Sequence, residues 1–338
     1  MTSITITDVA ERAGVSIKTV SRVLNSEPNV REDTRAKVLG AVKVLNYRPN
    51  YAARALAGSR SYLIGLYYDN PSPSYVGEVQ YGAVKACRET GHHLLVEQID
   101  GEKDTWRTQV ESLLRQVKVD GVVLSPPVCD RSPVLDVLEE QKIPFVRIAP
   151  AGDWDRGPYV YMDDKRAARD MTAYLLSLGH RRIGFVKGHP EHAATQARLA
   201  GFTQALTEAG VPLDPAYVQG GAFTFRSGFG AAERLLNLPL PPTAIFASND
   251  EMAVGVMAVA NRMQLNVPRD VSVVGFDDAP IAQSVWPQLT TVRQPVVEMA
   301  EAAAAMLIQP RASPPGTRSR MLEFALIVRG SAAPPPLA

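Results

Sequence analysis

The sequence has only two cysteines among its 338 residues, Cys87 and Cys129, and they lie far apart. Two distant cysteines provide no disulfide framework and no zinc-site spacing, and we expect reduced thiols in a cytoplasmic protein. His189 and His192 are near neighbours, but no matching carboxylate or cysteine pattern accompanies them. We therefore expect no metal.

Long apolar runs are also missing. No stretch approaches the ~20 uninterrupted apolar residues of a membrane helix, and the first residues lack the pattern of a secretion signal. We expect a cytoplasmic chain with no membrane partner. A hydrophobic content of 46% with 21% charged residues is typical of globular domains, and the length predicts two or three of them.

The motifs of common enzyme classes are absent as well. The chain has no G-x-G-x-x-G after its first strand, no G-x-x-x-x-G-K-[ST] phosphate loop and no G-x-S-x-G nucleophile motif. Asp277 and Asp278 form a carboxylate pair, but adjacent residues at a strand end usually point apart, which argues against acid catalysis. We therefore predict that the protein is not an enzyme and that it binds no cofactor.

Positive charge is concentrated near the N-terminus. The whole chain has a net charge of +1, yet residues 1–60 hold ten Lys or Arg against five Asp or Glu, which leaves −4 for the remainder. Such an excess fits contact between one small module and nucleic-acid phosphates. Solvent-exposed helix faces often carry a similar excess of positive charge, so charge alone does not distinguish nucleic-acid contact from an ordinary surface.

Residues 6–25 (ITDVAERAGVSIKTVSRVLN) predict two short helices joined by a tight turn. Thr5 and Asp8 stand three apart like a capping box, and Gly14 can take the positive φ that ends a helix. Ser16 is expected to cap the second helix. This pattern by itself would also fit any helical hairpin.

The second helix has an outward polar face, because Val20, Val23 and Leu24 form its inward stripe. Such a face suits the major groove, where polar side chains read base edges and basic ones also contact phosphates. A third helix within residues 29–45 completes a small core. The predicted DNA contacts of this domain are Thr5, Ser16, Ile17, Lys18, Thr19, Ser21, Arg22 and Asn25.

The motifs VAERAGVS, TVSRVLN, NYRPN and ARALAG resemble the N-terminal signature of the lactose repressor (LacI/GalR) family of bacterial regulators. The resemblance implies an all-α helix-turn-helix domain over residues 1–47 and a hinge over residues 48–60. In the family, paired hinge helices enter the minor groove and a leucine wedges between bases. Asn50, Ala53 and Leu56 match that hinge, although Leu56 could instead cover the next domain.

The rest of the chain alternates strands with helices, which predicts parallel sheets covered on both faces. The resemblance implies an α/β periplasmic-binding-protein-like core of two doubly wound parallel-sheet lobes. The expected N-terminal lobe spans residues 61–160 and 292–320, and the C-terminal lobe spans residues 161–291 and 321–330.

Two strands, near 159–162 and near 323–329, are expected in the C-terminal lobe.

Residues 331–338 (SAAPPPLA) have no leucine heptad and contain three prolines, so we expect a disordered tail and a homodimer without a tetramerising coil.

Doubly wound sheets bind ligands beyond the carboxyl ends of their strands. By motif match, the effector-binding residues are Asp69, Asn70, Tyr75, Tyr161, Arg198, Phe223, Asn249, Asp277 and Gln294. Three of the residues considered for the cavity have structural alternatives: Asp250 as a helix cap, Asp278 as a turn former and Phe223 as a core ring. Several sugar-binding relatives carry an aspartate where this chain has Ala149 and Pro150, which leaves the effector's orientation and class open.

Together these features predict a ligand-responsive repressor of carbohydrate-utilisation genes that binds palindromic operator DNA as a homodimer. A sugar or sugar derivative between the lobes would act as inducer or corepressor. One alternative is a solute-binding or sugar-processing protein with the same two-lobed core, and the first sixty residues argue against it. Another is a regulator with a non-sugar effector such as a nucleobase.

Overall fold

The computed structural model describes residues 4–24, 30–47, 60–100, 103–309 and 318–336. The chain divides after Tyr62 into two units, and each is described by itself.

The first unit is a bundle of three helices, α1 (Ile6–Ala13), α2 (Ile17–Leu24) and α3 (Glu32–Val44). The backbone N–H of Thr5 donates to Asp8 Oδ2 at 2.7 Å, Gly14 has a φ of 65°, and Ser16 Oγ accepts the Thr19 N–H at 3.2 Å. These contacts confirm the predicted caps and turn. Six side chains form the core, namely Val9, Ala10, Val20, Val23, Val38 and Ala41.

The N-terminal lobe of the second unit has a six-stranded parallel sheet in the order β11-β5-β4-β3-β1-β2. Its strands are β1 (Leu63–Tyr68), β2 (His93–Gln98), β3 (Gly121–Leu124), β4 (Phe145–Ile148), β5 (Tyr159–Tyr161) and β11 (Ser319–Met321). Its helices are α5 (Pro73–Glu89), α6 (Lys103–Gln116), α7 (Ser132–Glu140) and α13 (Val296–Ile308), with a short 3-10 turn at Val128–Asp130.

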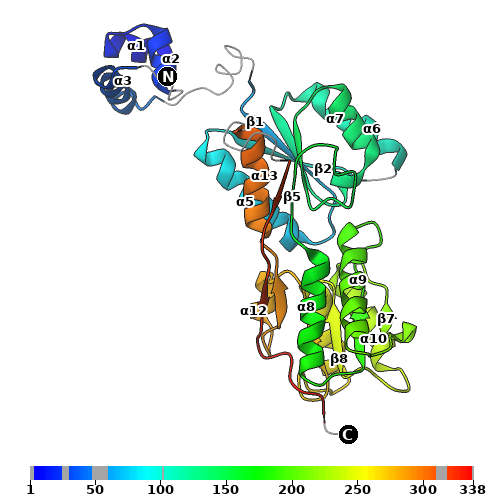
Figure 1. Ribbon diagram of the computed structural model, residues 1–338. Coiled ribbons are helices and arrows are strands. Elements are labelled where there is room, and N and C mark those ends of the chain that lie inside the picture. The colour runs from blue at the N-terminus through cyan, green and yellow to red at the C-terminus, as the bar shows by residue number, and fades with distance from the viewer. Residues whose placement is uncertain (1–3, 25–29, 48–59, 101–102, 310–317, 337–338) are drawn as a thin grey trace. The chain divides into compact units, whose positions relative to one another are not determined.

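Helix α13 comes late in the chain but lies beside α5 (Figure 1). A Cβ atom added at Gly82 of α5 would lie 2.1 Å from the carbonyl oxygen of Val297, so only glycine allows this approach. The two helices cover one face of the sheet, and α6 and α7 cover the other. Because both faces are buried, the central strands are almost wholly apolar.

The C-terminal lobe has a four-stranded parallel sheet in the order β7-β6-β8-β9. Its strands are β6 (Ile183–Val186), β7 (Val218–Gln219), β8 (Ala244–Ala247) and β9 (Ser272–Val274). Its helices are α8 (Asp164–Ser177), α9 (Ala193–Glu208), α10 (Phe225–Leu236), α11 (Asp250–Arg262) and the short α12 (Pro280–Ser284), with a 3-10 turn at Pro215–Tyr217. Helices α8 and α9 pack on one face, and α10 and α11 on the other.

Two of the expected strand positions were wrong. Strand β5 pairs with β4 and β11 in the N-terminal sheet, because Tyr159 aligns with Arg147 on one side and Ser319 on the other. The lobe boundaries therefore fall just after Tyr161 and Met321. Strand β12 (Ala325–Ile327) pairs antiparallel with β10 (Thr291–Arg293) in a separate two-stranded sheet and does not join the C-terminal one.

The described part of the tail, residues 331–336, corrects the expectation of disorder. Ser331 is 0% exposed, and its Oγ accepts the Thr290 N–H at 2.8 Å and donates to the Val273 carbonyl at 2.6 Å. The Val273 N–H in turn donates to the Ser331 carbonyl at 2.8 Å. The tail thus covers the open edge of β9, where an unpaired strand would otherwise expose its backbone groups.

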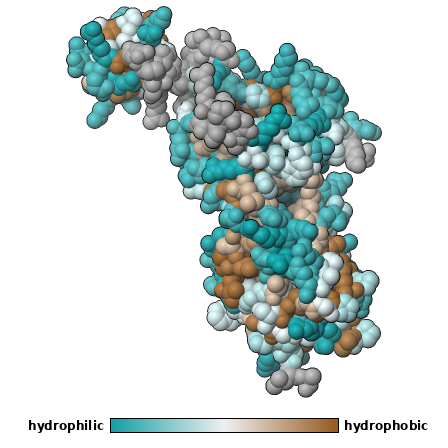
Figure 2. Space-filling view, in the orientation of Figure 1, coloured by the Kyte–Doolittle hydropathy of each residue, from teal (hydrophilic) through white to brown (hydrophobic). Residues whose placement is uncertain are grey.

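Hydrophilic residues cover much of the visible N-terminal lobe, whereas hydrophobic ones are more evident on the C-terminal lobe (Figure 2). The latter lobe exposes Phe225, Leu240 and Trp286. Among the described residues, no helix has both the length and the apolar character needed to cross a membrane.

Candidate functional site

A cavity of about 610 Å³ lies between residues of both lobes of the second unit. From the N-terminal lobe, residues at or after the carboxyl ends of β1, β3, β4 and β5 line it. From the C-terminal lobe, the start of α8 and residues that follow β6, β7, β8 and β9 line it. Eight of the predicted effector residues line this cavity: Asn70, Tyr75, Tyr161, Arg198, Phe223, Asn249, Asp277 and Gln294.

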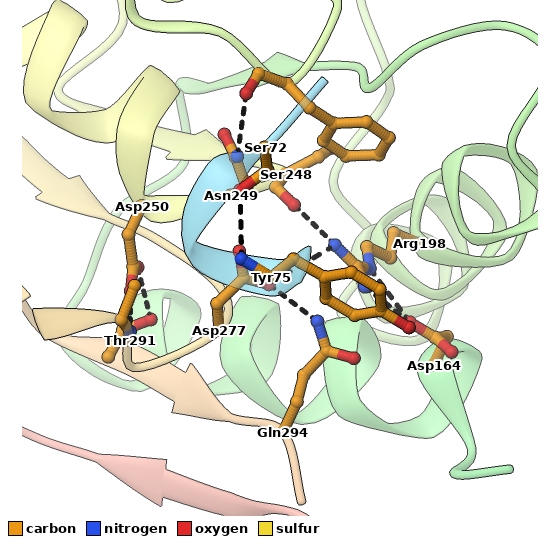
Figure 3. Close-up of polar contacts among 12 residues, drawn as sticks. Ser72, Tyr75, Asp164, Arg198, Ser248, Asn249, Asp250, Asp277, Thr291 and Gln294 are labelled. Carbon is orange, nitrogen blue, oxygen red and sulfur yellow. Dashed lines mark hydrogen bonds and ion pairs between the residues drawn. The ribbon is translucent and has the colours of Figure 1, made fainter. Parts of the chain in front are cut away.

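Arg198, on α9, is the central cation of the cavity and is only 4% exposed. Its Nε and Nη2 atoms lie 2.9 and 2.8 Å from Asp164 Oδ1, and its Nη1 donates to the Ser248 carbonyl at 2.5 Å (Figure 3). The guanidinium carbon is also 3.6 Å from the centre of the Phe276 ring. These contacts fix the side chain and neutralise its charge, because a buried cation is costly unless it is paired.

Asp277 follows β9, and its Oδ1 lies 4.0 Å from Arg198 Nη1. Gln294 points toward the same carboxylate and donates to Oδ1 at 2.6 Å (Figure 3). Burial raises the pKa of Asp277 to about 7, while Arg198 and Gln294 oppose the rise. The carboxyl therefore gains or loses its proton close to neutral pH.

Replacing Asp277 with asparagine is expected to stabilise the core more at pH 8 than at pH 5. The unfolded aspartate loses its proton near pH 3.8 and the folded one near pH 7, so the wild-type chain loses stability as the pH rises between these values. Asparagine does not titrate, and its carbonyl can still accept the Gln294 N–H. The stability gap should widen by on the order of 2 kcal/mol.

Thermal unfolding of both proteins at the two pH values measures this gap. Asp270→Asn is the control, because hydrogen bonds from Asn266 lower the pKa of Asp270 to about 2. Asp270 contributes its full share of stability above the unfolded-state pKa of 3.8 and loses it as the pH falls through about 2. The effect of Asp270→Asn on stability should therefore be the same at pH 5 and pH 8. A constant gap for Asp277→Asn would contradict the prediction.

Helix α2 of the first unit presents a polar face. Ser16, Ile17, Lys18 and Arg22 are exposed, whereas Val20 and Val23 are buried. Thr19 and Ser21 are half-buried, and Thr5 is exposed but belongs to the capping box of α1. Asn25, Asn50, Ala53 and Leu56 lie outside the described residues.

Comparisons with known proteins agree with both halves of this description. Residues 5–50 match the model of bacterial regulatory proteins of the lacI family, and residues 172–332 match a periplasmic binding protein-like domain. The ribose operon repressor of Escherichia coli (strain K12) is 34% identical over 97% of this chain and 99% of the relative. The chain belongs to the lacI family.

Two solved structures are also similar along nearly the whole chain. A lac repressor dimer bound to operator and the anti-inducer ONPF has a TM-score of 0.80 at 28% identity, over 98% of this chain and 100% of the other. A complex of the transcriptional regulator CelR with cellobiose has a TM-score of 0.74 at 30% identity, over 97% and 100%. This lacI-family chain is a DNA-binding transcriptional regulator and not an enzyme.

Asp69 is the predicted effector residue that the structure does not bring to the cavity. It forms an ion pair with Arg131, a buried side chain whose Nη1 also donates to the Ile99 carbonyl at 2.7 Å. Arg131 lies 62 positions away in sequence, so the motif around Asp69 gave no sign of this pairing.

Asn249 and Phe223 line the cavity but are also structural. The Asn249 side chain caps α11 by accepting the Met252 N–H at 2.9 Å and donates to the Phe223 carbonyl at 3.0 Å. The ring of Phe223 packs within the core cluster of α10 and α11. The core-ring interpretation of Phe223 is therefore confirmed, and its contact with an effector stays a prediction.

The two acidic residues with structural alternatives have several partners. Asp250 is the first residue of α11, not its cap, and it accepts hydrogen bonds from Thr291 Oγ1 at 2.6 Å and from the Ala279 N–H at 2.8 Å. Asp278 has a φ of 61° and pairs with Arg293 at 2.8 Å and Arg329 at 2.5 Å. The left-handed backbone of Asp278 is compatible with a turn, so its turn-forming role stays a prediction, and the capping role belongs to Asn249.

Sequence reasoning missed several residues of the cavity, among them Asp164, Trp154 and His192. Asp164 begins α8 shortly after β5 and follows the N-cap Asp163, so an acidic pair near a strand end was the available signal. Burial lowers the pKa of His192 to about 3, so its ring is uncharged. Among the described residues, no group of three His, Cys, Asp or Glu side chains could hold a metal ion.

Proposed function

We propose that this regulator binds a palindromic operator as a homodimer and that a sugar or sugar derivative in the interlobe cavity changes its affinity for that operator. The main support is the convergence of Arg198, Asp277 and Gln294 on one cavity in a chain with a helix-turn-helix domain. The lac repressor dimer bound to operator and the CelR–cellobiose complex support the same proposal by similarity.

The cavity supplies the chemistry that a polyol requires. Guanidinium, carboxylate and amide groups can each exchange two hydrogen bonds with neighbouring hydroxyls, and aromatic rings can cover the C–H face of a sugar. The Arg198, Asp277 and Gln294 side chains and the rings of Tyr75, Tyr161 and Phe223 are the effector contacts that we propose.

Effector binding can control DNA binding because residues of both lobes line the cavity. A ligand that favours one lobe arrangement shifts the equilibrium by its difference in affinity for the two states. A coupling of about 1–3 kcal/mol would change operator affinity by about 5- to 150-fold. Repression of carbohydrate-utilisation genes is the regulatory outcome that we propose.

Replacing Arg22 with alanine is expected to weaken operator binding by about 1–3 kcal/mol, or roughly 5- to 150-fold, because Arg22 lies exposed on α2. The full-length chain would first select a duplex from a random pool, and the affinities of both proteins for it would then be measured. Lys43→Ala, which removes one exposed charge from α3, is the matched control.

Two results would count against the proposal. If the full-length chain selects no duplex with or without metabolites, the regulator function fails. If Lys43→Ala weakens binding as much as Arg22→Ala, the contact depends on total charge and α2 is not the reading helix.

A further inference from the structure

The cavity has an aromatic margin on its N-terminal side. Trp154, in the loop between β4 and β5, lines the cavity beside Tyr161 and is still 47% exposed. The centroid of its ring lies 6.4 Å from that of Tyr161 and 5.0 Å from that of Tyr159. Three rings therefore form one cluster, and the ring of Trp154 remains accessible to a ligand.

A buried arginine holds the loop that carries Trp154. Arg147, in the middle of β4, is 1% exposed, and its guanidinium donates to the Asp153 carbonyl at 2.8 Å and the Gly152 carbonyl at 2.9 Å. It also donates to Asp130 Oδ1 at 2.8 Å, and the same oxygen accepts the Ala151 N–H at 2.9 Å. Since an arginine inside a parallel sheet is costly unless its donors are engaged, these bonds fix the loop before a ligand arrives.

The cavity carries no excess of positive charge. Three carboxylates line it, those of Asp163, Asp164 and Asp277, against the two cations Lys165 and Arg198. Asp164 already pairs with Arg198, and His192 is neutral. A phosphate or carboxylate placed beside Arg198 would lose its hydration next to a cation that is already paired, and the three carboxylates would repel it. Hydroxyl groups can instead donate to these carboxylates.

The residues proposed here to contact the two ends of the ligand come from different lobes. Arg198 and Asp277 come from the C-terminal lobe, and Trp154 and Tyr161 come from the N-terminal lobe. The cavity volume of about 610 Å³ falls within the range of about 300–1,000 Å³ that is usual for drug-sized ligands. A ligand that contacts both groups at once would also link the two lobes.

We propose that the effector is an uncharged glycoside with two rings, whose hydroxylated ring contacts Arg198, Asp277 and Gln294 while its second ring stacks on Trp154. This inference rests on the proposed function and narrows its effector class. Disaccharides, aryl glycosides and nucleosides share this chemistry, and the second ring distinguishes them.

Calorimetric titration of the full-length chain tests the inference. The probes are glucose, galactose and ribose, the disaccharides cellobiose and lactose, the p-nitrophenyl glycosides of the same sugars, the nucleosides uridine and adenosine, and the charged glucose 6-phosphate and glucuronate. At least one neutral two-ring probe is expected to bind about 10-fold more tightly than its free sugar, because stacking of the second ring adds to the gain from its buried apolar area.

The variant Trp154→Ala should remove this 10-fold advantage and leave the affinity for the free sugar unchanged, and Trp154→Phe should keep most of it. Trp286→Ala is the matched control, since Trp286 is 90% exposed and does not line the cavity. Three results would each overturn the inference. A free monosaccharide or a charged probe could bind most tightly, or no neutral probe could bind at all. In Trp154→Ala, one-ring and two-ring probes could lose affinity equally.

Measuring operator binding with the same protein preparation distinguishes a wrong effector class from a wrong regulatory function. If the chain still prefers its selected duplex while the neutral two-ring probes fail, only the effector class is wrong. If the chain prefers no duplex, the regulatory proposal fails whatever ligand binds.

Discussion

Replacing Arg198 with alanine is expected to abolish the effector response of operator binding and to lower the melting temperature of the core. The change removes a proposed ligand contact and also leaves Asp164 without its ion-pair partner at 2.8 Å. Removing one member of a buried pair typically costs about 3–5 kcal/mol. In a domain of this size that corresponds to a fall of roughly 10 °C.

A double variant separates the two roles of Arg198. In Arg198→Met with Asp164→Asn both charges are gone and most of the side-chain volume remains, so stability should largely recover. The effector response should not recover, because methionine cannot donate hydrogen bonds to a hydroxyl group. Recovery of both properties would mean that Arg198 supports the fold without contacting the ligand.

The local features of the first unit were predictable because their causes are local. The capping box needs only Thr5 and Asp8, three positions apart, and the end of α1 needs a residue that tolerates positive φ at position 14. The strand β5 shows the limit of this reasoning. Its sequence predicts a strand, but its place in the N-terminal sheet depends on partners near Arg147 and Ser319, and this pairing is not local.

The sequence likewise predicted some residues of the candidate site and not others. Polar residues that follow strands, such as Asp277 after β9, reach the cavity because parallel strands end at the same edge. Asp69 also follows a strand, but Arg131 from another part of the chain holds it. Trp154 could not be placed, because a buried side chain in β4, Arg147, fixes its loop. Motifs thus locate the end of each strand, and tertiary contacts decide where each side chain goes.

Deleting residues 331–338 is expected to lower the free energy of unfolding of the core by about 4 kcal/mol. The deletion removes both hydrogen bonds of Ser331 Oγ and leaves the buried N–H groups of Thr290 and Val273 without their acceptors. It also removes Ala333, whose carbonyl accepts from Ser272 Oγ at 3.0 Å and from His180 Nε2 at 2.9 Å. A buried group without a partner costs about 1–3 kcal/mol, so several losses reach this total.

Denaturant unfolding of the full-length chain and of two deletions measures this contribution. Deleting only residues 334–338 is the control, because it retains Ser331 and Ala333, and Ser331→Ala should give an intermediate loss of about 1–3 kcal/mol. Equal stability of the two deletions would mean that the tail only rests on the sheet.

The tail is also expected to influence the effector site. Ser331 bonds to Val273 in β9, and the loop after this strand carries Asp277. It bonds equally to Thr290, directly before β10, and Gln294 directly follows that strand. Because Asp277 and Gln294 share a hydrogen bond of 2.6 Å at the cavity, loosening both strands should weaken effector binding even at temperatures where the core stays folded. Unchanged effector affinity in the longer deletion would show that this pair keeps its geometry without the tail.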